Sequence, residues 1–242
     1  PALGVDVGPR PARRTVAELP RLVAPAIMSS AREEVLSRIR AALDDVPSAE
    51  TPAAVAVARD YRHTGWRSRE QLVEYLAERV ADYAAEVRRV AAADLADAVT
   101  AACAERGLHR VAVPPGLPAG WRPRDVELVE DEGLTAAELD RVDGAVTGCA
   151  AAIAETGTLV LDASPVCGRR ALTLVPDHHI CIVLAGQVVE LVPEAIAAVA
   201  PAVRDSRRPI TLVSGPSASS DIELSRVEGV HGPRDLLVLI AT

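Results

Sequence analysis

Phenylalanine is absent from this sequence, and aromatic residues of all kinds make up only 2% of its 242 residues. Apolar residues nonetheless account for 49% of the chain. This length and this composition are sufficient to bury a substantial core. The core must therefore be aliphatic, built from alanine, valine, leucine and isoleucine.

Lysine is also absent, so every basic residue other than histidine is an arginine. The net charge is −8, and the arginines are scattered among acidic residues without a basic stripe or an aromatic platform. These features argue against nucleic acid as a partner. No lysine is available to complete a Gly-x-x-x-x-Gly-Lys-Ser phosphate loop, and a Gly-x-Gly-x-x-Gly fingerprint is missing. We therefore expect neither ATP nor NAD, and no cofactor.

The sequence has no long uninterrupted apolar run. The longest one, Ile180–Val192, is broken by Gly186, Gln187 and Glu190, and it is too short to span a bilayer. No signal-like apolar segment opens the sequence. The sequence therefore predicts a cytoplasmic protein without a membrane span.

Closely paired cysteines, which zinc and iron–sulfur sites usually require, are missing. The four cysteines are far apart in the sequence, at Cys103, Cys149, Cys167 and Cys181. Free cysteine is among the most frequently buried residue types. We predict four buried free thiols and no metal site.

Before the main domain the sequence predicts an extension and a helix with a connector. Residues 1–27 are rich in proline and arginine and show no helical period. Residues 28–67 contain an amphipathic helix, expected over 31–43 with Ser30 as its N-cap and packed on the main domain. The connector after it is either solvated or a loop that reaches a site in this subunit or a neighbour, so a homo-oligomer stays possible.

Residues 68–242 show short aliphatic strands that alternate with capped helices. This alternation predicts an α/β fold with a mostly parallel sheet and helices on both faces. Three apolar runs in close succession predict a mixed or antiparallel insertion, and they lie at Thr158–Leu161, Ala171–Val175 and Ile180–Leu184. Asp177, His178 and His179 are expected in a hairpin between the last two runs rather than at a metal.

Two polar motifs follow predicted strands at 142–146 and 210–213. The first is Glu155-Thr156-Gly157-Thr158, and the second begins with Gly215-Pro216-Ser217. Open α/β sheets bind ligands beyond the carboxyl ends of their strands. We therefore expect both motifs to face one cleft at the carboxyl ends of the parallel strands.

Each polar group in these motifs also has a structural interpretation. Glu155 is either a solvated residue at a helix end or a general base or nucleophile at the cleft. Ser217 and nearby main-chain amides would hold an anion such as a carboxylate or phosphate. Asp221 and Glu223, in a Ser-Asp-Ile-Glu segment, would either line the site or cap a helical turn.

The last motif, Gly229-Val230-His231-Gly232-Pro233, places one histidine between two glycines. His231 would either donate to a bound anion or support its own loop. Ser217, His231 and Asp221 together suggest a catalytic triad, but the Gly-x-Ser-x-Gly nucleophile elbow is absent. That interpretation is therefore the weaker one.

Taken in order, these three motifs resemble the LUD-domain family, which is associated with bacterial lactate utilisation. The resemblance runs from about residue 142 to 242, and more loosely back to 28. It implies a fold similar to ribose-5-phosphate isomerases and CoA transferases. It also implies an accessory role beside iron–sulfur partner proteins that oxidise L-lactate to pyruvate. It names no catalytic residue, and it carries over the motif positions only: Glu155, Thr156, Gly157, Thr158, Gly215, Ser217, Asp221, Glu223, Gly229, His231 and Gly232.

Two function classes follow from the motifs and the resemblance. One is an accessory component of a lactate-oxidising system that binds a small anionic metabolite. The other is a stand-alone enzyme that acts on a phosphorylated or CoA-linked small acid, with Glu155 as base or nucleophile. A cleft where Glu155 meets a second polar group would favour the enzyme, and an apolar docking patch would favour the accessory protein.

Overall fold

The computed structural model describes residues 25–47, 51, 57–219, 227–228 and 232–242, with side chains at 31–47, 51, 57–217 and 232–242. The chain divides into two compact units, residues 1–60 and 61–242. The first unit contains α1, Pro25–Ala42. Because this helix is already formed at Pro25, Ser30 is not its N-cap, and the predicted start was wrong. Its packing on the second unit stays a prediction.

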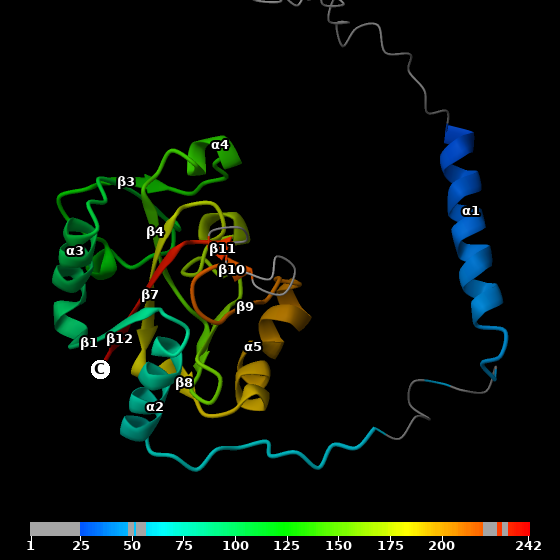
Figure 1. Ribbon diagram of the computed structural model, residues 1–242, viewed down its shortest axis with the longest axis horizontal. Helices are drawn as coiled ribbons and strands as arrows, with labels where there is room; N and C mark the ends of the chain where they lie inside the picture. Colours follow the sequence, from blue (N-terminus) through cyan, green and yellow to red (C-terminus); the bar gives the residue numbers. More distant parts are fainter. Residues whose placement is uncertain (1–24, 48–50, 52–56, 220–226, 229–231) are drawn as a thin grey trace, which may run out of the picture. The chain divides into compact units, whose positions relative to one another are not determined.

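The second unit is built around a six-stranded parallel sheet (Figure 1). The strand order is β1-β12-β7-β4-β2-β3, and every pair in it is parallel. Buried aliphatic residues dominate the central strands, as expected for a sheet covered on both faces. These strands are β1 (Glu86–Val90), β2 (Arg110–Val113), β3 (Glu127–Glu130), β4 (Gly144–Gly148), β7 (His178–Leu184) and β12 (Asp235–Ala241).

A second sheet of four strands lies on one face of the parallel sheet, with strand order β8-β5-β6-β9. Pairings of β6 with β5 and β9 are antiparallel, whereas β5 and β8 are parallel, so this sheet is mixed as predicted. A hairpin of β10 and β11 follows β9. These strands are β5 (Ala151–Ile153), β6 (Thr158–Leu161), β8 (Val188–Val189), β9 (Thr211–Val213), β10 (Ala218–Ser219) and β11 (Val227–Glu228).

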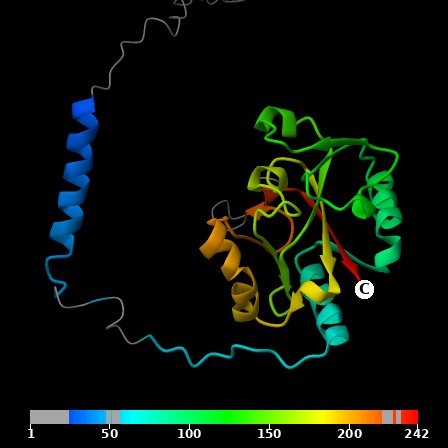
Figure 2. The same cartoon turned by 180° about the vertical axis from the view of Figure 1, so that it is seen from behind.

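Helices complete the layers (Figure 2). The helix α3 (Leu95–Glu105) packs on one face of the parallel sheet, and α2 (Arg69–Ala81) packs with the four-stranded sheet on the other. The helix α5 (Val192–Ser206) covers the outer face of the four-stranded sheet. The short helix α4 (Ala136–Leu139) lies near β2 and β4. None of the helices in the described residues is long and apolar enough to cross a membrane.

Local capping signals fix the starts of two of these helices. Ser68 accepts from the amide of Gln71, whose side chain accepts from the Ser68 amide in return, and α2 begins at the next residue. Thr135 and Glu138 form the same reciprocal pair before α4. Such a box satisfies two of the amides that a helix start leaves unpaired.

Three predictions in the insertion region were wrong. The run Ile180–Leu184 is not part of the mixed sheet, because it belongs to β7 of the parallel sheet. The run Ala171–Val175 is not a strand, because residues 170–173 form the 3₁₀ helix η4. His178 and His179 therefore do not sit in a hairpin but open β7. Their side chains point to opposite faces of the sheet, as alternation along a strand requires.

Candidate functional site

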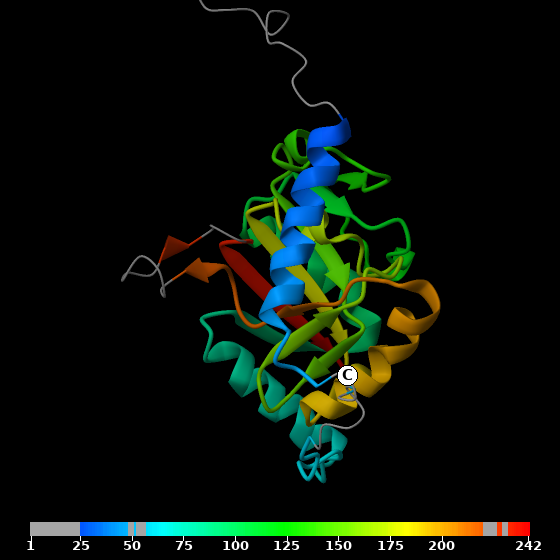
Figure 3. The same cartoon turned by 90° about the vertical axis from the view of Figure 1, so that its right-hand side faces the viewer.

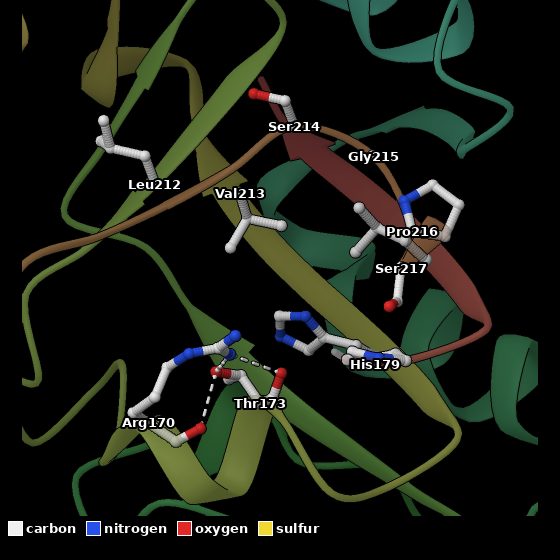
Figure 4. Close-up of a pocket in the computed structure, with 12 residues that line it drawn as sticks. Arg170, Thr173, His179, Leu212, Val213, Ser214, Gly215, Pro216 and Ser217 are labelled. Carbon is white, nitrogen blue, oxygen red and sulfur yellow. Dashed lines mark hydrogen bonds between the residues drawn. The ribbon is translucent and has the colours of Figure 1, made fainter. Parts of the chain in front are cut away.

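A cavity of about 210 Å³ lies at the amino-terminal ends of β7 and β12. Figure 3 shows these two strands side by side, and Figure 4 shows the cavity. Its polar side chains come from η4, β7 and the loop after β9. Among the described lining residues no side chain is a carboxylate. The lining consists of Arg170, Thr173, His179, Leu212, Val213, Ser214, Gly215, Pro216, Ser217, Gly232, Pro233 and Leu236.

Arg170 supplies the positive charge among the described lining residues. Its Nη1 donates to the carbonyl oxygen of Thr173 at 3.0 Å and to Thr173 Oγ1 at 3.2 Å, which holds the guanidinium over its own turn (Figure 4). Partial burial lowers the pKa of the Arg170 guanidinium, but an arginine stays protonated in proteins. Among the described lining residues, Arg170 is therefore the permanently charged cation, at the η4 side of the cavity.

His179 forms a buried wall of the same cavity. Only 1% of the residue is exposed, and its Nε2 lies 2.8 Å from Oγ1 of Thr147 on the neighbouring strand β4. Burial, together with the charge of Arg170, lowers the pKa of His179 to about 4. The imidazole is therefore neutral near pH 7, and it offers hydrogen bonding rather than charge.

The loop after β9 closes the cavity with small residues. Gly215 has a φ of +80°, and a Cβ there would lie 2.5 Å from Cβ of Tyr83, so only glycine fits this turn. The Ser217 amide donates to the carbonyl oxygen of Pro233 at 2.7 Å, which ties the loop to the start of β12. The structure thus places Gly215, Ser217 and Gly232 in one cavity lining.

A chain of hydroxyls connects the Glu-Thr-Gly-Thr turn to this loop. Oγ1 of Thr158 lies 2.7 Å from Oγ1 of Thr156 and 2.8 Å from Oγ of Ser214. Gly157 between them has a φ of +60° and packs against the backbone of Arg79. The two motifs are therefore neighbours, but the threonines reach the cavity only through Ser214.

Glu155 lies in a different hollow from Ser217. Its Oε1 is 3.1 Å from Nη2 of Arg62, and the side chains are 60% exposed at Arg62 and 42% exposed at Glu155. This second hollow has a volume of about 250 Å³ and is lined by Tyr61, Arg62, Glu155, Leu191, Val192 and Pro193. We expected Glu155 and Ser217 to face one cleft. Instead, their side chains line two separate hollows.

The Gly-Pro-Ser loop also does not lie at the carboxyl end of a strand of the parallel sheet, where we expected it. The strand β9, which carries the Gly-Pro-Ser loop, belongs to the four-stranded sheet rather than to the parallel sheet. Where the strand order reverses, between β2 and β4, residues 164–168 fill the carboxyl-end crevice. The amides of Gly116 and Gly148 donate to the carbonyl oxygens of Pro165 and Val166, each at 3.0 Å.

Four of the predicted site residues, Asp221, Glu223, Gly229 and His231, lie outside the described residues. Sequence reasoning missed Arg170, Thr173 and Thr147, and it assigned His179 to a turn. A signal existed for His179, because a histidine within an aliphatic run is a buried polar group that needs a partner. Arg170 gave no signal, because it stands among many scattered arginines.

All four cysteines are free and buried. Cys149, Cys167 and Cys181 belong to one core cluster. In the part of the chain that the structure describes, no group of three or more histidine, cysteine or acidic side chains has the geometry of a metal site. The prediction of buried free thiols is therefore confirmed.

Comparison with known proteins places these features in a family. The LUD domain family matches residues 68–241. "Lactate utilization protein C" of Deinococcus radiodurans is 49% identical over 174 residues, which cover 72% of this chain and 81% of that protein. "Uncharacterized protein NMB1437" of Neisseria meningitidis is 28% identical over 224 residues, 87% of this chain and 93% of that protein.

One solved structure has a similar fold. It is the crystal structure of a "duf162 family protein" from Deinococcus radiodurans, with a TM-score of 0.63 and 41% sequence identity. The match covers 73% of this chain and 99% of that chain. The family match spans the motifs, both sheets and the cavity, and the chain belongs to the LUD domain family.

Proposed function

We propose that this protein is an accessory component of an iron–sulfur system that oxidises L-lactate to pyruvate, and that it binds a small anionic metabolite in the cavity around Arg170. The names of its relatives support the lactate utilisation role. The observation that supports an anionic ligand is the lining of the cavity. Arg170, neutral His179 and several hydroxyls meet there, and none of the described lining side chains is a carboxylate.

The described part of this lining suits an anion. A guanidinium binds a carboxylate or phosphate through two parallel N–H donors. Ser217 lines the same cavity, and Gly215 lets the main chain approach closely. We propose that Thr156 and Thr158 act indirectly, by fixing Ser214 through their hydroxyl chain.

The remaining motif residues are assigned to the loop that would complete the site. In this proposal Asp221, Glu223, Gly229 and Gly232 shape the loop between Ser217 and β12. His231 would support the loop or donate to the ligand. Substitution of these groups is expected to weaken ligand binding.

The alternative function is an enzyme on a phosphorylated or CoA-linked small acid, with Glu155 as base or nucleophile. A fold similar to that of ribose-5-phosphate isomerases and CoA transferases would support it by analogy only. Glu155 pairs with Arg62 in a separate hollow, away from Arg170. This placement favours the accessory role.

Titration calorimetry tests the ligand site. The full chain would be titrated with L-lactate, pyruvate and inorganic phosphate. Arg170→Ala should weaken anion binding about tenfold or more, because a lost charged hydrogen bond costs about 1.5–3 kcal/mol. Arg170→Lys should keep part of the affinity, and Arg204→Ala on α5 serves as a matched surface control. Equal affinity of the Arg170→Ala and wild-type proteins would exclude this site.

Reconstitution tests the accessory role. The chain would be co-purified with iron–sulfur proteins of lactate oxidation, and L-lactate oxidation would be measured with and without the chain. We expect oxidation to depend on the chain and on Arg170. Oxidation at the full rate without the chain would rule out the role.

A further inference from the structure

The helix α5 has an apolar surface on both of its faces. Its inner face packs on the four-stranded sheet through Ala195 and Val199. No charged residue stands between Glu194 near its start and Arg204 near its end, so its outward face is also built from alanine, isoleucine, valine and proline. A helix that covers a sheet normally turns a polar face to water, and a helix that is apolar all round is normally buried. The outward face of α5 therefore indicates contact with another protein surface.

The exposed apolar side chains form one stripe along α5. Val192, Ile196 and Val203 are 38%, 49% and 45% exposed, and their spacing places them on one side of the helix. A hollow of about 230 Å³ lies beside the second half of the stripe, and Arg204 is the polar residue among its described lining. Exposed apolar patches with a polar rim mark interaction sites. The α5 surface, as we call it, consists of Val192, Ile196, Ala200, Val203 and Ile210.

Each end of the α5 surface carries a charged group with unused hydrogen-bonding capacity. At the carboxyl-terminal end, the Arg204 guanidinium has no partner among the described residues. At the amino-terminal end, Glu155 lies in the hollow that Val192 helps to line. Its Oε1 pairs with Arg62, but its Oε2 accepts no hydrogen bond from a described residue. Within the described part of the chain, the surface thus offers a free cation at one end and a free carboxylate oxygen at the other.

We propose that the α5 surface binds the same surface of a second copy of this chain, with the two α5 helices antiparallel. A two-fold axis brings a surface against its own copy and makes every contact twice. The carboxyl-terminal end of each stripe then lies over the amino-terminal end of the other, so Arg204 of each copy meets Glu155 of the other. The surface supplies both of the charges that it has to neutralise, which favours a second copy over a different protein. Neither Glu155 nor Arg204 lines the cavity of Arg170, so this inference is independent of the anion site.

The oligomeric state tests this proposal. Light scattering after size exclusion, over a series of protein concentrations, should give a mass of about 51 kDa, twice the chain mass of 25.4 kDa. Ile196→Asp should raise the dissociation constant of the dimer by about tenfold or more, because a charge would be buried without a partner. Ile39→Asp on α1 is the matched control, since Ile39 is also 49% exposed, and it should keep the dimer. A wild-type monomer at every concentration, or a dimer that Ile196→Asp leaves intact, would overturn the proposal.

Charge reversal tests the antiparallel arrangement. Arg204→Glu and Glu155→Arg should each weaken the dimer about tenfold, because each places like charges opposite one another. The double variant should restore the dimer, since each end again meets its opposite charge, and circular dichroism checks that all three variants are folded. A double variant that dimerises as weakly as the single ones would overturn the antiparallel pairing.

A different occupant of the α5 surface would give a different result. The wild-type chain would then be a monomer by itself, and Ile196→Asp would abolish its co-purification with iron–sulfur proteins of lactate oxidation while Ile39→Asp would not. That outcome would assign the surface to those proteins and overturn the second copy as its occupant.

Discussion

Oε1 of Glu190 lies 2.5 Å from Nη1 of Arg67, and only 2% of the Glu190 side chain is exposed. The other carboxylate oxygen accepts from the amides of Trp66 and Arg67 at 2.8 and 2.9 Å. One buried carboxylate thus anchors the segment that leads into α2. Arg67 also stacks between the rings of Trp66 and Tyr75, which holds the guanidinium in place.

We expect Glu190→Gln to lower the free energy of unfolding by about 2–3 kcal/mol. The amide replaces one acceptor oxygen with a donor that faces N–H groups, and it leaves the Arg67 guanidinium without its charge partner. Urea unfolding followed by circular dichroism measures the change. Glu74→Gln on the exposed face of α2 is the matched control and should change stability by less than about 0.5 kcal/mol. Equal stability of the two variants would contradict the anchoring role.

Acid should destabilise the protein through His179. The unfolded histidine binds a proton near pH 6.5, whereas the native ring does so only near pH 4. Between these values the unfolded state binds more protons, so the stability is fully present above about pH 6.5 and falls as the pH drops toward 4. The contribution lost is about 3 kcal/mol.

Urea midpoints at pH 7, 5.5 and 4.5 would measure this dependence. Carboxylates also titrate in this range, so the difference between wild type and His179→Gln isolates the histidine. We expect the variant to lose less stability than wild type between pH 7 and 4.5. Parallel curves for the two proteins would show that His179 does not cause the dependence.

Glycine at two turns should be required for stability. In Gly157→Ala the new Cβ would lie 2.7 Å from the carbonyl carbon and oxygen of Arg79, at a φ of +60°. Gly215→Ala would meet Tyr83 at 2.5 Å. We expect each to cost about 1–3 kcal/mol, since a left-handed conformation alone costs about 1–2 kcal/mol. Melting temperatures would show this, with Gly186→Ala, whose Cβ would meet no atom within 4 Å, as the control that keeps its stability.

The thiols should be unreactive in the native protein. Burial raises the pKa of Cys103 to about 11 and that of Cys167 to about 12. A hydrogen bond to Cys181, followed by burial, raises the pKa of Cys149. Thiolate is the reactive form, so a disulfide reagent at pH 8 should label these cysteines slowly. All four should react at once in guanidinium chloride, and rapid labelling of the folded protein would contradict the burial.

The sequence predicted strands best where aliphatic residues run between turn signals. The bounds of Thr158–Leu161 agree with β6, and the run Ile180–Leu184 lies within β7. The strand β5 was missed because Ala151–Ile153 is alanine-rich, and alanine gives little sign of a strand. The run 171–175 was wrongly predicted as a strand because its apolar residues suit a buried 3₁₀ turn equally well.

The site was predictable only in part, because its two halves come from distant segments. Gly215 and Ser217 drew attention through turn chemistry and hydroxyls, which are local signals. Arg170 and His179 come from η4 and β7, and only the folded chain brings them to the same cavity. The assignment of β9 to the parallel sheet was wrong because strand pairing depends on tertiary contacts that an apolar run does not encode.

Residues 164–168 fill the crevice between β2 and β4. Superposition of another α/β protein on this one therefore cannot be used to place a ligand there. A ligand transferred from another α/β protein by aligning the parallel sheets would overlap Pro165, which already contacts Gly116 closely. Docking and inhibitor searches directed at that crevice would therefore sample a volume that the protein itself occupies. Chemical probes for this family member are better directed at the opposite edge of the sheet, where Arg170 and His179 face an open cavity.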